Sequence, residues 1–190
     1  MKIGVLTFHR SINNGAVIQC YSLVTKLKEY FPNDIVEVID YHMPIVDETI
    51  YNFSWKRYFS GSFKHKVKQL LIAHKFVKVR KAQLLKKEVF SKVVNILPLS
   101  SKRIYSNNTN ELFSYINETY DIVIAGSDAI WNYKLRGFPN PYFLDEKITC
   151  RKFSYAASCF GMNYEKISEA EKNKIKTILD SYEFIGVRHS

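Results

Sequence analysis

Cysteine and long apolar runs are scarce in this chain of 190 residues, and each shortage excludes a class of protein. The three cysteines, Cys20, Cys150 and Cys159, are odd in number and lack metal-ligand spacing, which predicts free thiols, a reducing compartment and no metal site. No window approaches the roughly 18 apolar residues of a membrane-spanning helix. The first apolar run is also too short for a signal peptide. We therefore expect a cytoplasmic protein.

Acidic side chains are nearly missing from residues 56–103, where 14 Lys or Arg face a single acid, Glu88. The net charge of +10 therefore resides in this segment. Its apolar positions recur at helical spacing, which predicts a basic, mainly helical insertion. One interpretation is a solvated helical face. The other is attraction to anionic lipid at the inner membrane face or to a diphosphate-linked acceptor. No nucleic-acid-binding module is recognisable, so we expect no nucleic-acid partner.

The order of apolar segments predicts an α/β fold. Residues 2–8 and 35–41 are expected strands separated by a helix over 16–30, an order typical of parallel strands with a right-handed crossover. The other expected elements are helices over 110–118 and 168–181, the second opened by a capping box at Ser168, and strands over 121–125, 152–158 and 184–188. We expect a single Rossmann-like domain over residues 1–190, with a parallel sheet and flanking helices.

The polar loop over residues 9–15 joins the first strand to the first helix. Its candidate substrate-binding residues are His9, Asn13, Asn14 and Gly15. The free N–H groups of the following helix favour an anion. The alternative is a plain connecting loop with capping asparagines. A dinucleotide-binding loop needs three glycines where this one has a single glycine, so we expect no nicotinamide or flavin cofactor.

A second polar loop, residues 126–132, follows the strand that is most clearly part of the core. Gly126 allows close approach of another backbone, and Ser127, Trp131 and Asn132 are candidate substrate-binding residues. Asp128 is the candidate catalytic carboxylate, because an acid beside a tryptophan can bind sugar hydroxyls while the ring stacks on the sugar. The alternative makes Asp128 a helix cap and Trp131 a core residue.

Several segments, in order along the whole chain, resemble the polysaccharide pyruvyl transferase family. They are MKIGVLTFHRSINNGAVIQCYSL, IVEVIDY, DIVIAGSDAIWN, YFLDE followed by KFSYAASCFG, and IGVRHS. In the last segment His189 replaces the glutamate of the family pattern.

The resemblance implies transfer of pyruvate, as a ketal, from phosphoenolpyruvate to a sugar of a cell-surface polysaccharide or its lipid-linked precursor. It implies no cofactor beyond this donor substrate. It also implies the N-terminal half of a GT-B-type transferase with two facing domains, of which we expect the second to be absent here.

Two alternatives stay open. One is a truncated, non-catalytic domain that binds the acceptor or a membrane, and the other is the acceptor half of a nucleotide-sugar glycosyltransferase. As a member of this transferase lineage, too, we expect the 190-residue chain to be inactive alone. Because an apolar strand without a covering helix ends the chain, we also expect a homo-oligomer or a missing second domain.

Overall fold

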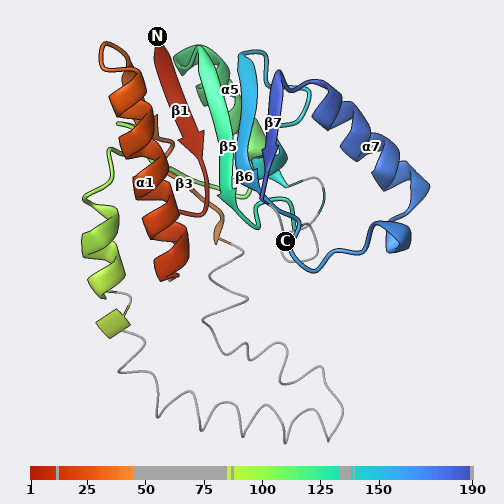
Figure 1. The fold of residues 1–190 in the computed structure, drawn as a ribbon, viewed down its shortest axis with the longest axis horizontal. Helices are drawn as coiled ribbons and strands as arrows, with labels where there is room; N and C mark the ends of the chain where they lie inside the picture. The colour runs from red at the N-terminus through yellow and green to blue at the C-terminus, as the bar shows by residue number, and fades with distance from the viewer. Residues whose placement is uncertain (12, 45–84, 87, 133–137, 139, 189–190) are drawn as a thin grey trace, which may run out of the picture.

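The computed structural model describes residues 1–11, 13–44, 85–86, 88–132, 138 and 140–188. Its main feature is a five-stranded parallel sheet in the order β2-β1-β5-β6-β7 (Figure 1). The strands are β1 (Lys2–Leu6), β2 (Ile35–Val38), β5 (Ile122–Asp128), β6 (Arg151–Ala157) and β7 (Phe184–Val187). This arrangement confirms the predicted α/β class with a parallel sheet flanked by helices.

Helices cover both faces of the sheet. On one face, α1 (Asn14–Tyr30) packs Cys20, Leu23 and Val24 against the sheet. On the other face lie α5 (Thr109–Thr119) and α7 (Glu169–Asp180) (Figure 1). Side chains of β5 alternate between the two cores, as expected for a strand buried on both sides.

The second expected strand, over 35–41, is divided in two. β2 ends at Val38, and β3 (Tyr41–His42) pairs with β4 (Ile104–Tyr105) in a separate two-stranded parallel sheet. The reason is a change of backbone partner, because Ser100 N donates to Val38 O at 2.8 Å and Ile104 N to Asp40 O at 2.8 Å. The prediction of a continuous strand over 35–41 was therefore wrong.

β5 is longer than the expected strand over 121–125. Its pairing with β6 continues to Asp128, which lies opposite Ala157. Gly126, Ser127 and Asp128 therefore belong to the strand rather than to the following loop, which begins at Ala129. The polar sequence GSD does not predict this extension, because the hydrogen-bond partners that make these residues a strand lie on β6.

The C-terminal elements agree with the predicted order. Ser168 caps α7 and forms the predicted capping box with Glu171. Two short 3-10 helices, η1 (Pro141–Phe143) and η2 (Tyr164–Lys166), precede it. β7 is an edge strand on which Phe184 and Val187 are exposed. Most of the basic segment over 56–103 lies outside the described residues. Among the described helices, none is long and apolar enough to cross a membrane.

Candidate functional site

The two polar loops leave neighbouring strands. β1 and β5 are paired in the sheet, with Leu6 opposite Ala125. From β1 the chain moves to β2 on one side, whereas β5, β6 and β7 lie on the other side. In open parallel sheets, ligands bind at the carboxyl ends of strands where the strand order diverges in this way. The carboxyl ends of β1 and β5 therefore form the candidate site.

The first loop ends in a capped helix. Asn13 Oδ1 accepts a hydrogen bond from Gly15 N at 2.9 Å, so Asn13 is the N-cap of α1. Asn14 and Gly15 lie in the exposed first turn, which contains no acidic side chain. The local geometry is therefore that of the alternative given above, a connecting loop with a capping asparagine. The same geometry leaves the positive end of a 17-residue helix facing solvent at this edge.

His9 lies inside the protein and fastens the first loop to the end of β2. Its side chain is fully buried, with Nε2 3.1 Å from Asp40 Oδ1 and Nδ1 3.2 Å from Thr7 O. Arg10 holds the same carboxylate with two hydrogen bonds, from Nε at 2.5 Å and from Nη2 at 2.6 Å. His9 is therefore a positioning residue in this arrangement, and its contact with substrate stays a prediction.

The charges of this cluster follow from burial and pairing. Burial lowers the pKa of His9 further than the hydrogen bond to Asp40 raises it, which favours a neutral ring. Burial alone would raise the pKa of Asp40. The hydrogen bonds and charges of His9 and Arg10 outweigh it, so the Asp40 pKa is well below its usual range. The result is a partly buried Asp40–Arg10 ion pair, in which Asp40 is buried and also receives a hydrogen bond from the buried histidine.

Gly126 brings β5 unusually close to β6. It has a φ of 149°, and a Cβ at this position would lie 2.0 Å from Tyr155 O. The close approach of another backbone predicted for Gly126 is therefore made to β6. The following Gly126–Ser127 peptide bond is cis, and Ser127 is buried. Asp128 is half-buried, and its Oδ1 accepts a hydrogen bond from Ala129 N at 2.7 Å.

Gln19 joins three elements at the same edge. When its amide is oriented to satisfy both neighbours, Nε2 donates to Ser127 O at 3.1 Å and Oε1 accepts from Arg188 Nη1 at 3.1 Å. Arg188 directly follows β7 and is exposed. A helix side chain therefore holds a guanidinium beside the end of β5.

The sequence interpretation did not name Gln19 or Arg188 as site residues. The available signals were a lone glutamine within the apolar stretch GAVIQCYSL and an arginine directly after the apolar strand FIGV. Neither signal shows that the two residues meet, because they are far apart in the sequence.

Trp131 packs in the core. Only 3% of its surface is exposed, and its ring stacks on Phe143 with centroids 5.9 Å apart and meets Tyr182 edge-on at 6.2 Å. This placement agrees with the core interpretation of Trp131, and stacking on a sugar stays a prediction. Asn132 is also buried and donates from Nδ2 to Phe160 O at 2.6 Å. Together these contacts fix the second loop against the segment that follows β6.

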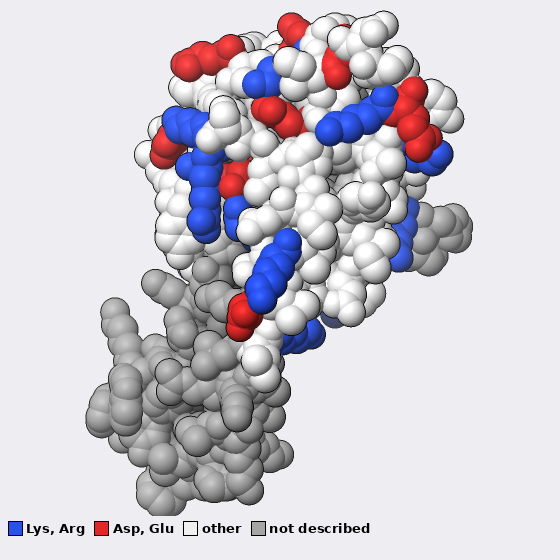
Figure 2. Space-filling view, turned by 90° about the vertical axis from the view of Figure 1, so that its left-hand side faces the viewer, with Lys and Arg blue, Asp and Glu red and all other residues white. Residues whose placement is uncertain are grey.

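Charges of both signs are mixed over the described part of the α1 face (Figure 2). The predicted membrane-facing surface depends on residues 56–103, most of which lie outside the described residues. Within the described ranges, no three His, Cys, Asp or Glu side chains lie close enough to hold a metal ion. The groups that the described edge offers a substrate are thus a carboxylate, a guanidinium and a helix N-terminus.

Comparison with known proteins assigns the chain to a family. The family model for polysaccharide pyruvyl transferase matches residues 13–188, which is nearly the whole chain. The chain belongs to the polysaccharide pyruvyl transferase family. No curated protein and no solved structure matches it. The matched range includes Asn13, Gln19, Asp128 and Arg188, so the candidate edge lies within it. The family indicates a polysaccharide pyruvyl transferase-like function for this domain.

Proposed function

We propose that this domain takes part in transferring pyruvate from phosphoenolpyruvate to two hydroxyls of one sugar. In this reaction the CH2 carbon of the enol accepts a proton and becomes a methyl group. The two sugar oxygens bond to the adjacent carbon and lose their protons, while the bond from that carbon to the phosphate oxygen breaks. The products are a cyclic ketal and inorganic phosphate. Family membership, together with a carboxylate and a guanidinium at one edge, supports this proposal.

The proposed roles follow the chemistry of each group. Asp128 binds a sugar hydroxyl and accepts its proton, which requires a half-exposed carboxylate of the kind found at the end of β5. Arg188 and the N-terminus of α1 attract the anionic donor. The remaining predicted contacts position the acceptor and the loops; they are His9, Asn13, Asn14, Gly15, Gly126, Ser127, Trp131 and Asn132.

The proposed acceptor is a sugar of a cell-surface polysaccharide or of its lipid-linked precursor. The edge would then form one wall of a cleft, as in GT-B-type transferases, with the general acid on the facing wall. A basic surface from residues 56–103 would favour a cytoplasmic position at the inner membrane face.

The decisive measurement is acceptor-dependent release of phosphate from phosphoenolpyruvate, made with this chain and with any longer natural form. In an active form, Asp128→Asn should lower kcat/KM for the acceptor by about a hundredfold or more, the usual contribution of a general base. Arg188→Met should mainly raise KM for phosphoenolpyruvate. Asp180→Asn, on the exposed end of α7, is the matched control. Unchanged acceptor kinetics in Asp128→Asn would remove Asp128 from the mechanism.

A further inference from the structure

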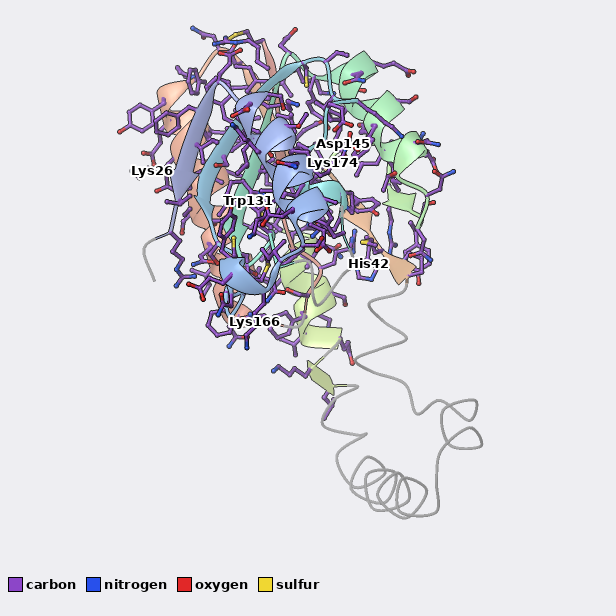
Figure 3. The ribbon with its side chains drawn as sticks, turned by 90° about the vertical axis from the view of Figure 1, so that its right-hand side faces the viewer. Lys26, His42, Trp131, Asp145, Lys166 and Lys174 are labelled. Atoms are coloured by element: carbon purple, nitrogen blue, oxygen red, sulfur yellow. The ribbon has the colours of Figure 1, made fainter. Side chains whose placement is uncertain are left out.

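Gln19 lies on the side of α1 that packs against the sheet. It comes three residues after Ala16 and four before Leu23, which are both buried, so the three side chains share one face of the helix. Gln19 itself is half-buried. Figure 3 views the molecule from the β7 side, with Lys26 of α1 and Lys174 of α7 on opposite faces of the sheet. A half-buried amide on such a face needs hydrogen-bond partners in place of water.

The amide of Gln19 finds its partners at the ends of two strands, β5 and β7. Its Nε2 donates to Ser127 O, in the residue before Asp128, and its Oε1 accepts from Arg188 Nη1, both at 3.1 Å. The backbone of Arg188 is fixed separately, because Arg188 N donates to Ala157 O at 2.9 Å. The contact with Gln19 therefore fixes the long side chain of a residue whose backbone is already anchored.

The partner of the Arg188 guanidinium is neutral. Arg10 is paired with the carboxylate of Asp40, and Arg151 with that of Glu183. Among the described residues, by contrast, no carboxylate lies within ion-pair distance of Arg188. An amide oxygen takes up one of the five N–H donors of a guanidinium and adds no negative charge. The other donors and the whole positive charge of Arg188 are therefore available to an anion.

We propose that Gln19 is a positioning residue, which holds the Arg188 guanidinium near the end of β5 with its charge open to the anionic donor substrate. This inference rests on the proposed function, because there Arg188 attracts phosphoenolpyruvate. Ordering a flexible side chain before the ligand arrives improves affinity by about two- to tenfold. A carboxylate at position 19 would also hold the guanidinium but would neutralise it. The neutral amide combines a fixed position with an available charge.

The first measurement needs no substrate. In protein labelled with ¹⁵N-arginine, the heteronuclear NOE of the Arg188 Nε–H group reports how rigidly the guanidinium is held, and Arg188→Met identifies the signal by its loss. We expect a rigid group in the parent chain and in Gln19→Glu, which still accepts from Arg188. In Gln19→Leu the group should be mobile. An Arg188 signal that stays equally rigid in a folded Gln19→Leu variant would overturn the inference.

The second measurement is the affinity for phosphoenolpyruvate, followed through the same signal. Gln19→Leu and Gln19→Glu both lose the donor to Ser127 O, so they differ mainly in the charge that they present to Arg188. Gln19→Leu should weaken binding about two- to tenfold. Gln19→Glu should weaken it by a further factor of about two to five, the effect of an ion pair at an exposed site. Ser22→Glu, at an exposed position of the same helix, adds the same charge and should bind like the parent chain.

The order of these affinities decides between the two roles that Gln19 could have. A purely structural role predicts equal affinities in Gln19→Leu and Gln19→Glu, or tighter binding in Gln19→Glu, and either result would contradict the inference. Failure of phosphoenolpyruvate to bind the parent chain would also overturn it. If Gln19→Leu does not fold, an affinity of Gln19→Glu equal to that of Ser22→Glu refutes the inference, and a lower one supports it. Neither measurement contains an acceptor sugar, so the transfer reaction keeps its separate test by phosphate release.

Discussion

Replacing Gly126 tests whether the end of β5 depends on contact between two backbones. An alanine there meets two obstacles, a φ of 149° that side chains rarely adopt and a Cβ 2.0 Å from Tyr155 O. The unfavourable φ costs about 1–3 kcal/mol. Since the obstructing atom belongs to the backbone of β6, the strands must separate, and overpacking of this kind adds about 1–3 kcal/mol. We therefore expect Gly126→Ala to lower the free energy of unfolding by about 2–6 kcal/mol.

The matched control is Gly161→Ala. Gly161 also has a positive φ, of 73°, but a Cβ there meets no atom within 4 Å. Only the conformational cost applies, about 1–2 kcal/mol for a residue in the left-handed region. In thermal unfolding, each kcal/mol lowers Tm by about 2–4 °C for a domain of this size. Urea unfolding of both variants gives the free energies directly. A Gly126→Ala loss no larger than that of Gly161→Ala would refute the argument from the β5–β6 contact.

Three further predictions concern buried or capping polar groups. His9 in the unfolded chain has a pKa of about 6.5, whereas burial lowers the pKa of His9 in the folded protein. Lowering the pH from about 6.5 should therefore reduce the free energy of unfolding, by up to about 1.4 kcal/mol per pH unit. Urea unfolding at about pH 7 and pH 5.5 measures this change, and the change in the free energy of unfolding between the two pH values should be smaller in His9→Gln. An equal change in His9→Gln would contradict the argument from burial of His9. Asp40 acts in the same direction but only at lower pH, since its folded pKa is also lowered. Lys152→Met should lower the free energy of unfolding by about 1–3 kcal/mol, because two backbone carbonyls and a serine hydroxyl lose their hydrogen-bond donor. In the control Lys26→Met, which replaces an exposed lysine, the free energy of unfolding should change by no more than about 0.5 kcal/mol. Equal losses in the two variants would refute the role given to Lys152. Asn13→Ala should cost about 1 kcal/mol in thermal unfolding by removing the cap of α1, and no loss would show that the cap is not needed.

Elements with a strong local pattern could be predicted from the sequence. The first strand, expected over residues 2–8, is found over Lys2–Leu6, and the helix that follows the capping box at Ser168 begins where the pattern predicts it. Local interactions decide these elements, since a cap and a run of apolar residues act within a few positions. The end of β5 and the break after Val38 could not be predicted, because they depend on which distant backbone offers the next hydrogen bond.

The sequence by itself determined the α/β class, the family and the two polar segments that carry the candidate site. Only the tertiary structure placed these segments side by side, because strand order depends on how distant parts of the chain pack. It also buried His9 against Asp40 and Trp131 against Phe143, whereas their residue types alone are compatible with exposed contacts. Finally, it joined Gln19 to Arg188, a meeting of residues separated by most of the chain. Whether a polar side chain faces solvent or holds a loop is set by the neighbours that folding supplies, and those neighbours are distant in sequence.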